Sequence, residues 1–130
     1  MTLPSPDPSR LVADLARLVA FDTQNPPGNE HEAALFVQHR LAEAGFAGTI
    51  DTLAPGRSTV EARLSNGEGP VLAFCTHLDV VPVGEGWSQD PFRLHEAGGL
   101  LYGRGACDAK GSLAAMLEAL RLLAACRDAW

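Results

Sequence analysis

The sequence predicts an α/β protein in which a layered sheet is flanked by helices. Apolar residues recur at helical spacing near both ends of the chain, and short extended segments fall between them. Helices before and after a cluster of strands favour a layered α/β arrangement. With 130 residues, the chain is long enough for one domain with a hydrophobic core and too short for two domains of ordinary size.

Composition and charge exclude several classes of partner. The chain is 46% apolar and 20% charged, which is typical of soluble globular proteins. Its net charge is −6 and its basic residues form no cluster, so neither nucleic acid nor a membrane is an expected partner. The start lacks the apolar core of a secretory signal, and no apolar run approaches the roughly 20 residues of a spanning helix. Three widely spaced cysteines without a C-x-x-C pattern favour reduced thiols and a cytoplasmic location.

A first helix is predicted to begin at Pro8, with Asp7 as its N-cap, because proline at the first helical position needs no N–H donor. The helix carries one apolar stripe, formed by Leu11, Val12, Leu15, Leu18 and Val19. The N-P-P-G segment at 25–28 cannot continue a helix, because two proline rings fix φ and remove two donors.

A second helix is predicted after Asn29, which can form a capping box with Glu32. Gly45 should end this helix. Its buried side is expected to comprise Ala33, Ala34, Val37, Leu41 and Ala44.

Three short segments, 49–53, 59–64 and 71–76, are predicted to be strands. The second alternates as a half-exposed strand should, with Val60, Ala62 and Leu64 on one face and Glu61 and Arg63 on the other. The third is apolar on both faces and is therefore a candidate central strand.

A long loop over residues 80–99 follows, and loops of that length in compact domains tend to be functional or disordered. A final helix is predicted from about Gly111. Its apolar positions follow steps of three and four residues: Leu113, Met116, Leu117, Leu120, Leu123 and Ala124.

The triplet H-L-D at 77–79 directly follows the third predicted strand. Because side chains alternate along a strand, His77 and Asp79 are expected on the same side of it. The carboxylate can there accept the imidazole N–H that does not face a metal ion, which makes the other nitrogen a better ligand. From the triplet alone, half of a metal site and a solvated or structural pair at a strand end both stay open.

The second candidate cluster is L-Y-G-R-G-A-C-D-A-K-G-S at 101–112. It matches neither common nucleotide motif. In G-x-G-x-x-G, Asp108 stands where the third glycine belongs. A P-loop requires the order G-K-S or G-K-T, but here the order is Lys110-Gly111-Ser112. What remains is a glycine-rich turn that presents Asp108 just before the last helix. On local sequence, Asp108 fits a functional carboxylate and a helix N-cap equally well.

Together, these motifs resemble the core of a known family. The patterns H-x-D-V-V-P, W-x-x-D-P-F and G-x-L-Y-G-R-G-x-x-D-x-K-G resemble those of metal-dependent amidohydrolases in order and spacing. That family includes acetylornithine deacetylase, succinyl-diaminopimelate desuccinylase, aminoacylase and related carboxypeptidases. The first two predicted helices and the N-P-P-G-N-E segment also resemble the family's N-terminal region, so the resemblance covers essentially the whole chain.

The resemblance implies roles for three residues. His77 matches the histidine that binds the first metal ion, and Asp108 matches the carboxylate that bridges two metal ions. Asp79 matches the catalytic aspartate that orients the histidine. The resemblance also implies a cis peptide bond between Asp108 and Ala109, and alanine stands there where relatives commonly have methionine.

The resemblance further implies a hydrolase that cleaves an amide bond of an N-acyl amino acid or a small peptide. Two divalent ions, zinc with cobalt or manganese as substitutes, would lower the pKa of a bound water and polarise the amide carbonyl. A carboxylate general base would pass the water's proton to the leaving amine.

Relatives take their remaining metal ligands and the general base from later parts of their chains, and they dimerise through an inserted domain. No matching residues follow Trp130, and His31, His39 and His95 sit in no matching motif. Residues 1–130 are therefore expected to form a partial catalytic domain, the N-terminal portion of a dinuclear zinc-hydrolase domain, which is inactive alone. The alternative is a catalytically inactive fragment or binding module that retains the fold.

Several expectations concern single side chains. Cys75 is expected to be a small buried hydrophobe, and Arg104 is expected to pair with a nearby carboxylate. Leu122, Leu123 and Trp130 are expected to expose apolar area, and an uncovered sheet edge is expected to invite aggregation.

Overall fold

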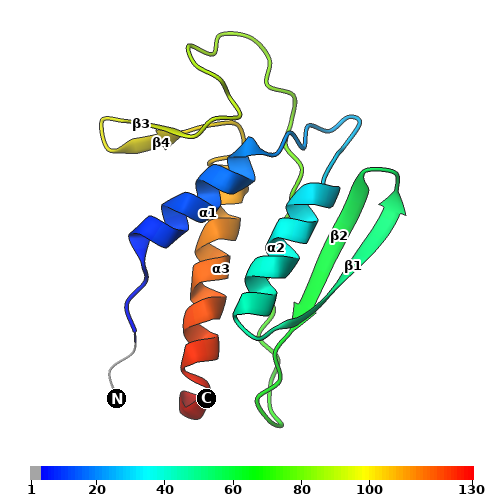
Figure 1. Ribbon diagram of the computed structural model, residues 1–130, viewed down its shortest axis with the longest axis vertical. Coiled ribbons are helices and arrows are strands. Elements are labelled where there is room, and N and C mark those ends of the chain that lie inside the picture. The colour runs from blue at the N-terminus through cyan, green and yellow to red at the C-terminus, as the bar shows by residue number, and fades with distance from the viewer. Residues whose placement is uncertain (1–3) are drawn as a thin grey trace.

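A computed structural model describes residues 4–130 of the chain. Three helices lie side by side, and a hairpin of two strands lies along one of them (Figure 1). A second, shorter hairpin lies near the C-terminal end of the first helix (Figure 1). In chain order the elements are α1 (Pro8–Ala20), α2 (His31–Glu43), β1 (Ala47–Ala54), β2 (Arg57–Arg63), β3 (His95–Ala97), β4 (Leu100–Tyr102), α3 (Lys110–Ala125) and a 3₁₀ turn (Arg127–Ala129). The predicted α/β class is confirmed.

Helix α1 begins as the sequence predicts. A carboxylate oxygen of Asp7 accepts hydrogen bonds from the backbone N–H groups of Ser9 and Arg10, at 3.0 and 3.2 Å. Leu15, Leu18 and Val19 are buried, but Val12 is 38% exposed, so its place in the buried stripe is wrong. Val12 lies on a flank of the helix that no other described element covers.

Helix α2 buries four of the five predicted residues, namely Ala33, Ala34, Val37 and Leu41, whereas Ala44 is half-buried at the C-cap. The predicted capping box of Asn29 and Glu32 is wrong, because the N-cap residue is Glu30 and no side chain caps the helix. The β1–β2 turn takes over this function, since the carbonyl of Gly56 accepts the His31 N–H at 3.0 Å. The Glu30 carboxylate pairs instead with the Arg57 guanidinium. Gly45, with φ of +87°, follows the helix as predicted.

The strands form two antiparallel hairpins, β1 with β2 and β3 with β4. In the first hairpin Ile50 is opposite Val60. The predicted alternation along β2 is confirmed, because Val60 and Ala62 are partly buried whereas Glu61 and Arg63 are exposed. The hairpin packs this apolar side against α2.

The predicted central strand at 71–76 is absent. This segment pairs with no other strand in the part of the chain that the structure describes. Val71 is 77% exposed and Leu72 72% exposed. A strand that is apolar on both faces needs neighbours at its edges and layers over its faces, and residues 4–130 provide neither. Cys75 is therefore exposed, and its predicted burial is wrong.

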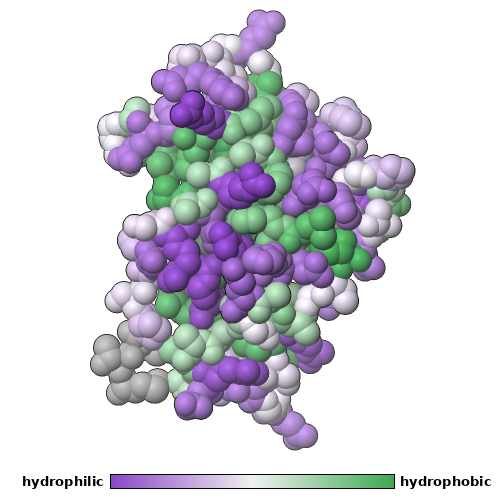
Figure 2. Space-filling model, viewed as in Figure 1, coloured by the Kyte–Doolittle hydropathy of each residue, from purple (hydrophilic) through white to green (hydrophobic). Residues whose placement is uncertain are grey.

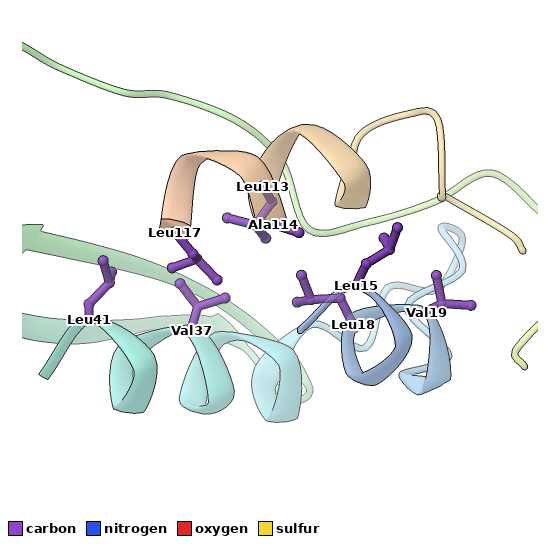
Figure 3. Packing of buried hydrophobic residues seen from close by; sticks show 8 residues of the cluster. All are labelled: Leu15, Leu18, Val19, Val37, Leu41, Leu113, Ala114 and Leu117. Atoms are coloured by element: carbon purple, nitrogen blue, oxygen red, sulfur yellow. The ribbon is translucent and has the colours of Figure 1, made fainter. Parts of the chain in front are cut away.

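The hydrophobic core lies between the three helices. Side chains of α1 and α2 point toward α3, whose Leu113, Ala114 and Leu117 meet them (Figure 3). The other buried members are Leu15, Leu18, Val19, Val37 and Leu41. This arrangement brings the start of α1 against the middle of α3, because the Asp7 N–H donates to Glu118 Oε1 at 2.9 Å.

A network of ion pairs joins the three helices beside this core, and hydrophilic side chains gather over α1 and α3 in Figure 2. Asp14, which is buried, pairs with Arg40 at 2.9 Å and with Arg121 at 3.3 Å. Glu118, also buried, pairs with Arg121 at 2.7 Å and with Arg10 at 2.9 Å. The hydrogen bond from Arg10 is the main reason why the pKa of Glu118 falls from 4.5 to about 2.

Within residues 4–130, none of the helices combines the length and the apolar character that crossing a membrane requires.

Candidate metal site

Three side chains that the sequence singles out meet at one place. His77 and Asp79 lie at the end of the unpaired segment that leads to Val80, and Asp108 lies in the turn before α3. His77 Nε2 is 3.0 Å from Asp108 Oδ1, although 31 residues separate them in the chain. The predicted convergence of His77 and Asp108 is therefore present.

Both nitrogens of the His77 ring face oxygen atoms. Nδ1 is 3.0 Å from the carbonyl oxygen of Asp79 and 3.2 Å from its carboxylate Oδ1. Because a carbonyl oxygen only accepts hydrogen bonds, Nδ1 carries a hydrogen. Nε2 faces a carboxylate, which also only accepts, so Nε2 carries a hydrogen when the ring is protonated and presents its electron pair toward Asp108 in the neutral form that keeps its hydrogen on Nδ1. This is the orientation in which a histidine binds a metal ion through Nε2.

The charges of the site shift both pKa values. Burial lowers the pKa of His77, but the hydrogen bonds to Asp79 and Asp108 and the charges of these carboxylates outweigh it, so the pKa is raised. The hydrogen bond from Asn25 and the nearby imidazole lower the pKa of Asp79 despite its partial burial.

The segment after α1 holds the His77 side of the site in place. Gln24 and Val80 form an isolated parallel bridge. Thr23, which is fully buried, donates from Oγ1 to the carbonyl of Leu78 at 2.7 Å. Asn25 Nδ2 donates to Asp79 Oδ2 at 2.9 Å.

The turn that carries Asp108 is held by α1 and by its own glycines. Gly105 has φ of +81°, and a Cβ there would lie 2.6 Å from Val80 Cγ1. The Lys110 ammonium donates to the carbonyl of Phe21 at 2.8 Å, which attaches the start of α3 to the end of α1 (Figure 1). Lys110 is 1% exposed, and burial lowers its pKa to about 8.

Asp108 itself projects outward, with its side chain 86% exposed. The N-cap position of α3 belongs to Ala109, and no side chain caps the helix, so the N-cap interpretation of Asp108 is wrong. The peptide bond between Asp108 and Ala109 is cis, as the resemblance implies.

The donor set fits part of a metal centre. Nε2 of His77 and Oδ1 of Asp108 are about as far apart as two ligands that each lie roughly 2 Å from one zinc ion. Imidazole nitrogen and carboxylate oxygen are also the ligand types that zinc accepts. Among residues 4–130, however, no group of three His, Cys, Asp or Glu side chains is placed to surround one ion. The residues present fit two ligands of a site that needs more.

The other three histidines and Arg104 lie away from the cluster of His77, Asp79 and Asp108. His31 is 2.9 Å from Ser58 Oγ, His39 is solvent-exposed beside Glu43, and His95 stacks on Tyr102. The prediction that Arg104 pairs with a nearby carboxylate is wrong. Its guanidinium donates to the carbonyls of Pro82 and Val83 and lies over the Trp87 ring, because the loop folds back over it.

One surface pocket is separate from the cluster of His77, Asp79 and Asp108. It has a volume of about 600 Å³ and lies between the 85–89 loop and the β3–β4 hairpin. Neither His77 nor Asp108 lines it. The chemistry of the His77 site is therefore at an open surface.

Sequence reasoning missed three residues that hold the site, namely Thr23, Asn25 and Lys110. Thr23 and Asn25 flank a loop that the prolines mark only as a helix breaker. Lys110 stands in the D-A-K-G motif, which was a signal for it, but its burial against the end of α1 depends on contacts across 89 residues of chain.

Fold and site together define an α/β protein in which a histidine and two aspartates from distant segments form one polar cluster. Comparison with protein-family models matches residues 73–128 to peptidase family M20/M25/M40, and this range includes all three residues. The resemblance that the motifs predict is confirmed.

Two curated relatives and one solved structure are similar to this chain. The chain is 40% identical over 121 residues to succinyl-diaminopimelate desuccinylase of Zymomonas mobilis, covering 88% of this chain and 30% of that protein. It is 60% identical over 55 residues to the enzyme of the same name from Legionella pneumophila strain Lens, covering 41% of this chain and 15% of that one. The crystal structure of human carnosine dipeptidase 1 is similar with a TM-score of 0.73 and 27% identity, covering 90% of this chain and 28% of that chain. The chain thus spans less than a third of the length of these relatives.

Proposed function

We propose that this chain contributes the His77–Asp108 part of a dinuclear metal centre in a hydrolase that cleaves an amide bond of an N-acyl amino acid or a small peptide. The observation that carries the proposal is the 3.0 Å approach of His77 Nε2 to Asp108 Oδ1. The desuccinylase and dipeptidase names of the relatives support a small acylated or peptide substrate.

Each of the three residues has a role that follows from its contacts. His77 is a ligand through Nε2, because Nδ1 is engaged by Asp79. Asp108 is the bridging ligand, and its exposed carboxylate has free oxygen lone pairs for two ions. Asp79 keeps the hydrogen on Nδ1 and makes Nε2 a stronger donor to a cation.

A divalent ion in this position, zinc or its substitute cobalt, supplies Lewis acidity toward a water and an amide carbonyl. The chain's part is to hold the ligands in place. When His77 is protonated, Nε2–H donates to Asp108 Oδ1, so protonation of His77 competes with metal binding.

Residues 1–130 correspond in this proposal to a partial catalytic domain. The remaining ligands and the general base come from polypeptide outside these residues, as does the surface through which full-length relatives dimerise. The isolated chain is then inactive in hydrolysis. A cytoplasmic location stays a prediction.

The second candidate is a catalytically inactive fragment or binding module that retains the fold. The exposed apolar side chains at 71 and 72 favour neither candidate by themselves. What separates the two candidates is metal binding at His77.

A zinc titration of the purified chain by calorimetry tests the proposal. We expect His77→Ala and Asp108→Ala to weaken zinc binding by at least tenfold, because each removes a ligand. His39→Ala is the matched control, since His39 is a solvent-exposed histidine of α2. Zinc affinity that is equal in the wild type and in His77→Ala would contradict the proposal.

A turnover assay with N-succinyl-diaminopimelate or N-acetylornithine and added zinc or cobalt tests the partial-domain proposal. We expect no turnover from the isolated chain. Turnover that His77→Ala abolishes would show that the chain is a complete enzyme and would refute the partial-domain proposal.

A further inference from the structure

Among residues 4–130, Asn25 makes one side-chain hydrogen bond, and its acceptor is the carboxylate that contacts His77. Asn25 Nδ2 is 2.9 Å from Asp79 Oδ2. Because an ionised carboxylate only accepts hydrogen bonds, the amide must turn its NH₂ group toward Asp79. The other carboxylate oxygen, Oδ1, is the one that lies 3.2 Å from His77 Nδ1. The three side chains thus form a line, Asn25–Asp79–His77.

The backbone of Asn25 is hydrogen-bonded to the segment that carries Asp79. The Asn25 N–H donates to the Val80 carbonyl at 2.8 Å, and the Val80 N–H donates to the Thr23 carbonyl at 3.0 Å. The buried Thr23 hydroxyl adds a bond to the carbonyl of Leu78. These hydrogen bonds hold residues 23–25 against residues 78–80 and place the Asn25 amide next to Asp79.

We propose that Asn25 is a positioning residue of the site, which orients the Asp79 carboxylate so that His77 keeps its hydrogen on Nδ1 and presents Nε2 toward Asp108. The proposal deepens the proposed function and rests on it for its metal part. Its effect on the His77 ring does not depend on a bound metal ion.

The physical reason is a competition between the two ring nitrogens. In a neutral His77, either Nδ1–H bonds to Asp79 or Nε2–H bonds to Asp108, and each form satisfies one side only. Without the Asn25 donor, the Asp79 carboxylate can rotate toward solvent, and Nδ1 keeps only the Asp79 carbonyl. The form with the hydrogen on Nε2 then gains population, and in that form Nε2 cannot bind a cation.

The test is the ¹⁵N NMR spectrum of the His77 ring in the 130-residue chain, at a pH where the ring is neutral. We expect the Nδ1–H form to predominate in the wild type. Asn25→Leu keeps the approximate shape of the side chain but has no donor, and it should raise the population of the Nε2–H form about threefold or more. Asn29→Leu, a change at an exposed position of the same loop, should leave the ring spectrum unchanged.

A double-variant comparison separates positioning from general damage to the fold. In an Asp79→Ala background, Asn25→Leu should produce no further change at His77, because the carboxylate through which it acts is gone. A further change in that background, or an unaltered ring spectrum in Asn25→Leu alone, would overturn the proposal. Asn25→Ala serves as a second variant if Asn25→Leu does not fold.

A further experiment measures metal binding, with zinc as the only metal ion added. We expect Asn25→Leu to weaken zinc binding by roughly tenfold, the lower end of what is usual for residues that support a ligand. If the wild type binds no zinc at His77, the metal part of the proposed function fails, while the ring spectra still decide whether Asn25 positions Asp79. If zinc binds equally well to wild type and Asn25→Leu, the positioning role toward the metal is refuted.

Discussion

At the scale of single residues, the site depends on how closely the backbone of one segment approaches another. Gly105 lies against Val80, the residue that also bridges to Gln24. Only a residue without a Cβ allows this approach together with a positive φ. The turn that presents Asp108 thus packs closely against the segment that presents His77 at one glycine.

Gly105→Ala tests this coupling. We expect a loss of about 2 to 4 kcal/mol in the free energy of unfolding, because the new Cβ meets the buried Val80 side chain and the backbone is in the left-handed region. The measurement is urea unfolding followed by circular dichroism.

Gly98→Ala is the matched control, since Gly98 also has a positive φ but a Cβ there would meet nothing within 4 Å. It should cost only about 1 kcal/mol, the backbone part of the effect. Equal losses in the two variants would show that the contact with Val80 does not matter.

At the scale of elements, local pattern predicted the helices well and the sheet poorly. The Asp7 cap, the buried side of α2 and the alternation along β2 are decided by neighbours in sequence, so the sequence alone reveals them. The strand at 71–76 was predicted from its apolar character, yet strand formation depends on partners that sequence pattern does not specify. The same reason explains the missed capping of α2, where a distant carbonyl replaces the expected side chain.

The same distinction between local and long-range contacts applies to the candidate metal site. The motifs identify His77, Asp79 and Asp108, and the spacing of His77 and Asp79 predicts that they act together. The supporting contacts of Thr23 and Lys110 join segments 55 and 89 residues apart, so no local pattern could indicate them.

Because of the ion pairs between the helices, the free energy of unfolding depends on pH in the acid range. The pKa of Glu118 is depressed in the folded state, so its contribution is fully present above pH 4.5 and is lost as the pH falls toward about 2. We expect Glu118 to account for up to about 3 kcal/mol of the stability lost over this range.

Glu118→Gln should therefore unfold with a weaker dependence on pH between 4.5 and 2 than the wild type. The measurement is the midpoint of urea unfolding at a series of pH values. A wild-type pH profile in Glu118→Gln would show that the pairing with Arg10 and Arg121 does not depress this pKa.

At the scale of the whole molecule, the unpaired segment at 71–76 leaves apolar side chains and backbone hydrogen-bonding groups uncovered. Val71 and Leu72 are the most exposed apolar residues in it. Uncovered extended segments of this kind favour association between copies.

We expect the isolated chain to self-associate with rising concentration, and the double variant Val71→Lys, Leu72→Lys to remain monomeric under the same conditions. Because both side chains already face solvent, the change in unfolding free energy should stay within about 0.5 kcal/mol. Sedimentation velocity measures the association. Unchanged self-association in the double variant would place the contact elsewhere.

The contact of α1 with α3 has a consequence for biosynthesis. The Asp7 N–H meets Glu118 across 111 residues, so the first helix leaves the ribosome long before its partner has been translated. At roughly 5 to 20 residues per second, this delay lasts about 5 to 20 seconds. A helix of 13 residues is marginal alone in water, so α1 is expected to wait as a fluctuating nascent segment. The core between α1 and α3 then closes only after α3 has been synthesised.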